Sequence, residues 1–142
     1  MAEGDFTLYN FYKGQQANGN IDLVNDTIKV MLVAGYTPNI DTHLYKSDVD
    51  ANEVALTNYT AGGATLAGKA VAVNNTNDRA EWDFTDVTFT ALGSGAVSHA
   101  IIYKDTGAAG TSVLIGYIEL TKQPNGADYS LLVGANGAIH FS

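Results

Sequence analysis

The clearest alternation of apolar and polar residues in the chain runs from residue 79 to residue 91. Between 79 and 84 every second residue is apolar, including the only tryptophan, Trp82, and the residues between are charged. Such a period of two predicts a β-strand with one buried face and one face in water. After Thr85–Asp86 the alternation shifts by one residue. An uninterrupted strand would turn the second apolar set to solvent, so we predict a β-bulge or tight corner there, and a chain that crosses between sheets.

Further short apolar segments are separated by glycine, asparagine and aspartate turns. Residues 27–34 and 113–120 are apolar on both faces, which predicts strands in the middle of a sheet. Residues 96–104 alternate and lead into 105–111, an expected hairpin tip. About ten short strands with regularly spaced turns predict an all-β fold, an antiparallel β-sandwich or barrel with one or two short helices. We expect residues 1–142 to form this one domain.

Turn signals also predict particular connections. Ile21–Val24 and Thr27–Ala34 are expected to pair as a hairpin across an Asn-Asp turn. Asn136-Gly137 predicts a two-residue turn that pairs the last two strands. Gly62-Gly63 predicts a turn or bulge, because the Lys-Ser/Thr pair of a phosphate-binding loop does not follow.

The first 18 residues combine an acidic start with a run of aromatics. Met1–Asp5 is expected to be a loose arm. Within Phe6–Ala17 the apolar residues from Leu8 onward have helical spacing, and Asn18-Gly19 is a suitable helix end. The same aromatics also suit a strand. We favour a short helix, whose aromatics either pack in the core or dock on a neighbouring subunit.

The segment that begins at Asp41 is expected to form a short helix, capped by that residue or by Thr42. Within it, a D-x-D-x-N stretch beginning at Asp48 matches the first three ligand positions of an EF-hand calcium loop. The match then fails, because Glu53 stands where that loop needs glycine and Tyr59 where it needs the bidentate glutamate. We interpret the stretch as a solvated acidic segment, with calcium binding as the alternative.

Charge and composition narrow the classes of partner. The net charge is −8, with 15 acidic residues against 7 basic ones, which argues against a nucleic-acid partner. No apolar run approaches the ~20 residues of a membrane span, so we expect no membrane partner. Cysteine is absent, which excludes disulfides, thiolate metal sites and cysteine nucleophiles.

The sequence contains no recognisable catalytic motif. The three histidines, His43, His99 and His140, lack the i, i+4 spacing of a helical metal site, and no serine lies in a G-x-S-x-G turn. Asp83 and Asp86 could form an acid–base pair, but a role in the local turn explains them equally well. We therefore expect no enzyme, no metal and no cofactor.

Short segments rich in aromatics and glycine occur in order along nearly the whole chain. They are Phe6–Asn10, Gly19–Leu23, Asp26–Val30, Tyr36–Pro38, Thr42-His43 with Tyr45, Asn52–Val54, Tyr59–Leu66 and Ile115–Tyr117. In this order they resemble a family of small structural proteins from tailed bacteriophages. The resemblance implies a virion component of the decoration or tail-fibre type, and it brings no catalytic residues with it.

The first functional hypothesis is a capsid decoration (cement) protein on the virion surface. It would bind the outside of the shell formed by the major capsid protein and bridge capsomers, as a homotrimer on local symmetry axes. The aromatic N-terminal segment would lie across a neighbour or the shell, since aromatics supply much of the energy of interfaces. The expected contact residues there are Phe6, Leu8, Tyr9, Phe11 and Tyr12.

The alternative hypothesis is a tail-fibre or receptor-binding module that recognises a host surface glycan or protein. Its expected contact residues are Tyr36, Tyr45 and Tyr59, in the loops between Gly35 and Gly63. A β-sandwich serves either role, so fold alone cannot separate the two hypotheses. The number of copies per virion does separate them.

Overall fold

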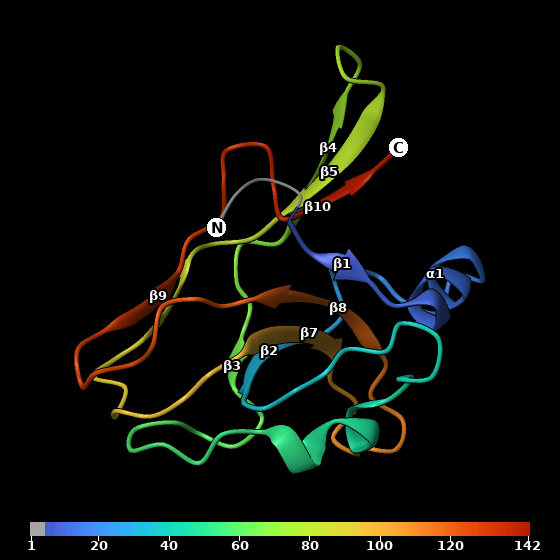
Figure 1. Ribbon diagram of the computed structural model, residues 1–142. Coiled ribbons are helices and arrows are strands. Elements are labelled where there is room, and N and C mark those ends of the chain that lie inside the picture. The colour runs from blue at the N-terminus through green and yellow to red at the C-terminus, as the bar shows by residue number, and fades with distance from the viewer. Residues whose placement is uncertain (1–4) are drawn as a thin grey trace.

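The computed structural model describes residues 5–142 and has a mostly β fold of three antiparallel sheets and one short α-helix (Figure 1). Residues 1–4 of the expected acidic arm lie outside the described part. The strands are β1 (Thr7–Leu8), β2 (Ile28–Val33), β3 (Ala64–Thr65), β4 (Ala70–Asn74), β5 (Arg79–Asp83), β6 (Val87–Phe89), β7 (His99–Lys104), β8 (Leu114–Glu119), β9 (Tyr129–Leu131) and β10 (Ile139–Phe141). The helices are α1 (Asn10–Ala17) and the single 3₁₀ turns η1 (Lys46–Asp48) and η2 (Asp50–Asn52).

The largest sheet has the order β1-β8-β7-β2-β3, and the others have the orders β10-β5-β4 and β6-β9. Every pair of neighbouring strands is antiparallel. The expected all-β antiparallel fold is therefore confirmed. Of the two expected architectures it is sandwich-like, because no sheet in residues 5–142 closes into a barrel.

The middle of the large sheet is built from the segments that are apolar on both faces. β2 lies between β7 and β3, and β8 lies between β7 and β1. Both strands are buried along most of their length, as expected for residues covered on two sides. β7 and β8 pair as a hairpin around residues 105–113, which confirms the predicted tip.

The predicted corner after residue 84 is confirmed. β5 belongs to the three-stranded sheet and β6 to the two-stranded one, with residues 84–86 between them. Trp82 on β5 and Val87 and Phe89 on β6 are all buried. The shift in alternation thus keeps the apolar side chains inside while the chain changes sheet.

The predicted hairpin between Ile21–Val24 and Thr27–Ala34 is wrong, because no strand forms at residues 21–26 and the chain turns at residues 23–26. The carboxylate of Asp22 accepts hydrogen bonds from the backbone N–H groups of Val24 and Asn25, and that of Asp26 accepts one from the N–H of Asp22. These acceptors replace the partners that a neighbouring strand would have supplied.

The predicted turn at Asn136-Gly137 does not pair the last two strands, because β9 and β10 lie in different sheets. Gly137 has a φ of 90°, and a Cβ there would lie 2.6 Å from the carbonyl oxygen of Trp82. The glycine is therefore required for close approach to β5 as well as for the turn.

The helix prediction for the N-terminal segment is confirmed by α1, which ends before Asn18. The prediction that Asp41 or Thr42 caps a helix is wrong. The helical residues begin only at Lys46, and the backbone N–H groups before them bond to the carboxylate of Asp48. Asp48 takes the place of a capping residue at Asp41 or Thr42, because its carboxylate lies close in sequence to these N–H groups.

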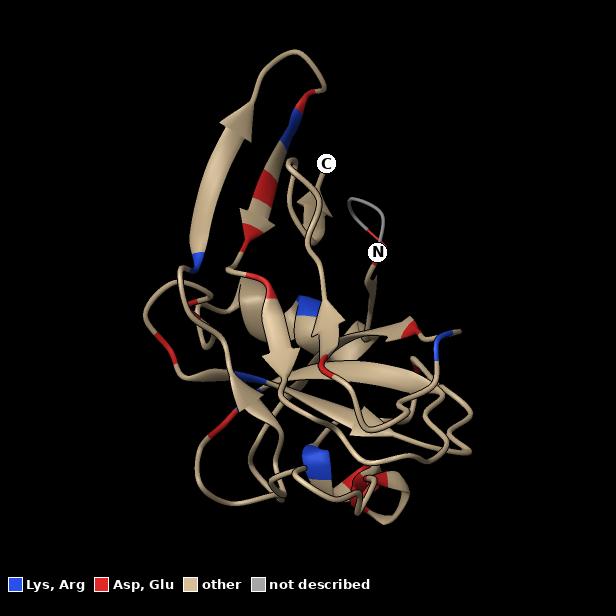
Figure 2. Cartoon of the chain, turned by 90° about the vertical axis from the view of Figure 1, so that its left-hand side faces the viewer, with Lys and Arg blue, Asp and Glu red and all other residues tan. Residues whose placement is uncertain are grey.

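The β4–β5 hairpin projects from the rest of the molecule in both views (Figures 1 and 2). Its inner end is anchored by Trp82, which is fully buried and donates from Nε1 to the carbonyl oxygen of Leu23 at 3.1 Å. Its outer strand, β4, is exposed from Ala70 to Val73. Acidic and basic residues mark β5 but not β4 (Figure 2).

Candidate functional site

Half of the predicted contact residues have their side chains in the core of this chain. Tyr9 and Tyr12 are fully buried, and Phe6 and Tyr36 are each 6% exposed. In the isolated chain these side chains offer almost no surface to a partner. Their role in partner binding stays a prediction, and their role in packing is shown directly.

The buried tyrosines form a hydrogen-bonded chain that ends at a histidine. The hydroxyls of Tyr9 and Tyr36 lie 2.8 Å apart, and the Tyr36 hydroxyl lies 2.7 Å from Nδ1 of His43. Burial raises the pKa of both tyrosine hydroxyls above their ordinary value. The Tyr36 ring also contacts the His99 ring, at a centroid distance of 5.4 Å. No sequence spacing indicated this convergence, because long-range folding creates it.

The other four predicted contact residues, Leu8, Phe11, Tyr45 and Tyr59, are partly buried against the core. The rings of Phe11 and Tyr45 meet edge to face at 5.2 Å. They come from α1 and from the loop before η1. Both remain partly exposed, so this aromatic pair is a part of the predicted contact set that the helix and the loop jointly present to solvent.

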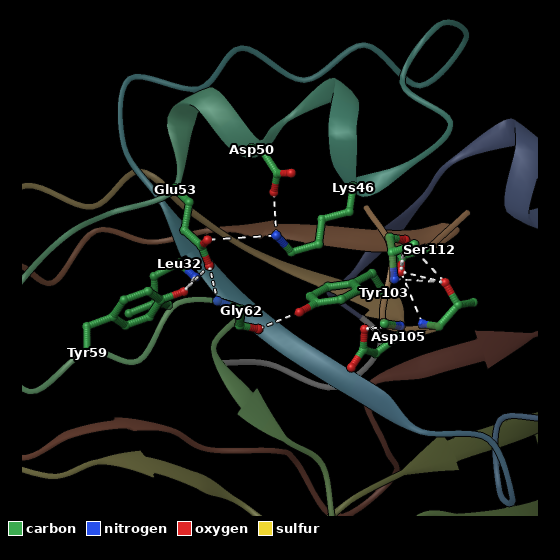
Figure 3. Close-up of polar contacts among 12 residues, drawn as sticks. Leu32, Lys46, Asp50, Glu53, Tyr59, Gly62, Tyr103, Asp105 and Ser112 are labelled. Carbon is green, nitrogen blue, oxygen red and sulfur yellow. Dashed lines mark hydrogen bonds and ion pairs between the residues drawn. The ribbon is translucent and has the colours of Figure 1, made fainter. Parts of the chain in front are cut away.

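A pocket of about 420 Å³ with several charged residues in its lining lies between η1, η2 and the end of β7. Lys46 extends along its wall and forms ion pairs with Asp50 and, at 3.8 Å, with Glu53 (Figure 3). The ammonium group also lies 5.7 Å from the centre of the Tyr103 ring. At the other end, Asp105 lies 3.2 Å from the ammonium of Lys29.

Tyr59 fills a gap in the edge of the large sheet next to this pocket. Its hydroxyl accepts from the N–H of Leu32 at 3.1 Å and donates to Glu53 at 2.8 Å. The same carboxylate oxygen of Glu53 accepts from the N–H of Gly62, also at 2.8 Å (Figure 3). The side chain thus acts as a substitute for a missing strand and fixes the loop that follows it.

Polar side chains of this pocket form hydrogen bonds with the backbone of its own walls. The hydroxyl of Tyr103 donates to the carbonyl oxygen of Gly62 at 2.5 Å, and burial raises the pKa of this hydroxyl. The N–H of Gly107 lowers the pKa of Asp105. Among residues 5–142, no buried side-chain nitrogen or oxygen is left without a partner. The arrangement holds two loops on the sheet.

The candidate calcium ligands do not converge. Asp48 bonds to the backbone N–H groups of Leu44 and Tyr45, whereas Asp50 pairs with Lys46. Within the described residues, no group of three His, Asp or Glu side chains is placed to hold a metal ion. The partial EF-hand match is explained by turn formation and an ion pair.

A larger groove, of about 790 Å³, opens between β8 and the segment that runs into β9. His99, Tyr117 and Glu119 lie on its sheet wall, and Asp128 and Tyr129 lie on the other. Burial lowers the pKa of His99. Sequence reasoning did not single out this groove, because its walls meet only where the large sheet and the segment of β9 fold together.

No protein-family model matches the chain, and neither does any curated protein. None of the described helices has the length and hydrophobicity needed to cross a bilayer.

Replacing Asp48 with asparagine is expected to destabilise the fold at neutral pH and to have less effect in acid. The backbone N–H groups of Tyr45 and Leu44 lower the pKa of the Asp48 carboxyl below its ordinary 3.8. Its contribution is therefore present above that value and is lost as the pH falls through the folded-state pKa. Urea unfolding of wild type and Asp48→Asn across this pH range measures the difference. Asp78→Asn, in an exposed turn, is the control, and a difference independent of pH would contradict this assignment.

Proposed function

We propose that this chain is a structural protein of a phage virion, a capsid decoration protein that binds the outside of the major capsid shell and bridges capsomers. The observation that carries the proposal is the convergence of the segments that resemble the phage family. They are distant in sequence, yet several of them contact one another inside the fold. The segments on which the resemblance rests therefore belong to the scaffold of the molecule and are not confined to one loop.

Two of these contacts involve the N-terminal segment. Thr7 on β1 pairs with Tyr117 on β8, and the N–H of Tyr9 donates to the carbonyl oxygen of Ile115 at 3.1 Å. A Cβ at Gly116 would lie 2.9 Å from the carbonyl oxygen of Thr7. The Ile-Gly-Tyr segment is thus the place where the N-terminal strand docks.

A third contact joins Asn52–Val54 to Tyr59–Leu66. Glu53 receives hydrogen bonds from the Tyr59 hydroxyl and from the N–H of Gly62. The glycines of the second segment let the loop turn back on the sheet. These contacts tie the segments to the large sheet, and we propose that this connected scaffold carries the contact surface of a cement protein.

The Phe11–Tyr45 pair is the surface that we assign to the shell. Partly exposed aromatic rings supply large contact area with little loss of side-chain entropy. In the homotrimer that this hypothesis includes, each copy contributes one such pair, so three weak contacts act together through multivalency. A bridging protein needs this kind of repeated, modest contact.

Replacing both Phe11 and Tyr45 with alanine is expected to lower binding to shells that lack this protein by at least about tenfold. Purified chain is added to such shells, and the bound copies are counted after sedimentation. Val24→Ala, at a 40% exposed apolar residue, is the matched control and is expected to bind like wild type. Thermal unfolding confirms that each variant is folded.

Quantitative mass spectrometry of virions separates decoration from the tail-fibre alternative. A decoration protein is present in many copies, in proportion to the major capsid protein. A few copies per particle would overturn the capsid proposal and favour a receptor-binding module. Wild-type binding by the double variant would overturn only the assignment of the contact surface.

A further inference from the structure

Among residues 5–142 only β5 pairs with β4, so β4 is the open edge of the three-stranded sheet in the described part of the chain. Its side chains are exposed from Ala70 to Val73, with Val71 50% and Val73 74% exposed. The strand stands on the projecting hairpin, away from the other two sheets (Figure 1). A second strand can therefore approach it without meeting the body of the molecule.

The free hydrogen-bonding groups of β4 belong to its two valines. The carbonyl oxygen of Trp82 accepts from the N–H of Ala138, so the backbone groups of Trp82 face β10. Successive residues of a strand direct these groups to opposite sides, so Glu81 and Asp83 face β4. Their partners Ala72 and Ala70 face inward, which leaves the N–H and C=O groups of Val71 and Val73 directed outward.

This edge lacks the features that usually prevent strands from pairing between molecules. Proteins protect open edges with charged residues, proline, bulges or covering loops. β4 has the sequence Ala-Val-Ala-Val-Asn, without charge or proline, and pairs regularly with β5. Val71 and Val73 also continue the apolar face that contains Trp82, because they lie opposite Trp82 and Ala80. An added strand would extend this face.

The charges at the two ends of β4 identify the occupant. Lys69 precedes the strand, and Asp78 closes the turn that follows it. Lys69 also donates to the carbonyl oxygen of Asp26 in its own chain. A second copy aligned antiparallel about Ala72 brings each Lys69 opposite Asn75, in the turn of the other copy that ends at Asp78. The stretch from Val54 to Asn77 contains no acidic residue, so this edge also avoids the repulsion between two chains of net charge −8.

We propose that β4 pairs antiparallel with β4 of a second copy of this chain, about a two-fold axis at Ala72. The three-stranded sheets of the two copies then form one continuous sheet with a common apolar face. Val71 exchanges backbone hydrogen bonds with Val73 of the second copy, and the two Ala72 residues form the central non-hydrogen-bonded pair. The contact is isologous, and it does not depend on the capsid role. In a shell of trimers it would join one trimer to the next.

A single engineered cysteine tests this pairing, because the natural chain has none. The Cα atoms of a central non-hydrogen-bonded pair lie about 4.5 Å apart, within the range that a disulfide can span. Ala72→Cys is therefore expected to give a disulfide-linked product of twice the chain mass on mild oxidation. Ala127→Cys, in an exposed turn, is the matched control and is expected to cross-link much more slowly.

A second variant distinguishes pairing from random collision. Adding Val73→Lys to Ala72→Cys places a charge at the edge and is expected to slow cross-linking by about tenfold. Sedimentation of the wild type and of Val73→Lys compares their assembly in the absence of a covalent cross-link. Circular dichroism confirms that both are folded. Equal cross-linking of Ala72→Cys and Ala127→Cys would overturn the proposal. A second pair of results would also overturn it: Val73→Lys abolishes assembly, but Ala72→Cys does not cross-link. In that case β4 would pair with a strand other than β4 of the second copy.

Discussion

Replacing Gly63 with alanine is expected to destabilise the fold by about 3 kcal/mol or more. Gly63 has a φ of 80°, which costs free energy for any residue with a Cβ. That Cβ would lie 2.7 Å from the carbonyl carbon of Val30 and 2.8 Å from Cα of Met31, and closer still to the Val30 oxygen. These are backbone atoms of β2, a strand paired on both sides, so they cannot move aside without breaking the large sheet.

Chemical unfolding of Gly63→Ala against wild type measures this loss. Gly14→Ala is the matched control, because Gly14 lies within α1 and a Cβ there meets no atom within 4 Å. The control is expected to stabilise the fold by about 0.5–1 kcal/mol through helix propensity. If Gly63→Ala were as stable as wild type, the close approach of the loop to β2 would be wrong.

The same glycine shows what the sequence could and could not predict. The Gly62-Gly63 dipeptide predicted a turn, and both residues do have positive φ. The reason that Gly63 must be glycine is its contact with β2, more than thirty residues earlier in the chain. A turn signal describes local conformation only, and the packing that depends on it comes from the fold.

Alternation predicted strands reliably where burial decides the structure. β5, β6, β7 and the corner after β5 followed from it, whereas β2 and β8 followed from runs that are apolar on both faces. It failed at residues 21–24, where Ile21 and Leu23 are buried as expected for one face of a strand. There the side chains of Asp22 and Asp26 bond to the nearby backbone and stabilise a turn with the same inward-facing residues.

The candidate contact surface was predicted less well than the fold. Aromatic residues suit both cores and interfaces, so composition did not separate Tyr9 and Tyr12, which are buried, from Phe11, which is partly exposed. The β4 edge was missed because its small side chains alternate only weakly. Its significance depends on which strands flank it, and no local pattern contains that information.

Replacing Trp82 with alanine is expected to destabilise the fold by about 4 kcal/mol or more, of which removal of the ring accounts for most. Trp82 is fully buried, and its ring packs on that of Phe84 at 5.2 Å. Loss of the indole N–H also leaves the carbonyl oxygen of Leu23 without its partner. Because Trp82 anchors the three-stranded sheet to the turn at residues 23–26, we expect the projecting hairpin to loosen first.

Two further variants separate the contributions of ring and hydrogen bond. Trp82→Phe keeps an aromatic ring but removes the donor to Leu23, so its expected loss is smaller, about 1–3 kcal/mol. Val73→Ala, on the neighbouring strand but 74% exposed, is expected to change the stability of the monomer by less than about 0.5 kcal/mol. Urea unfolding followed by circular dichroism measures all three, since fluorescence would lose its only tryptophan. If Trp82→Ala cost no more than Val73→Ala, the hairpin would not be anchored through this side chain.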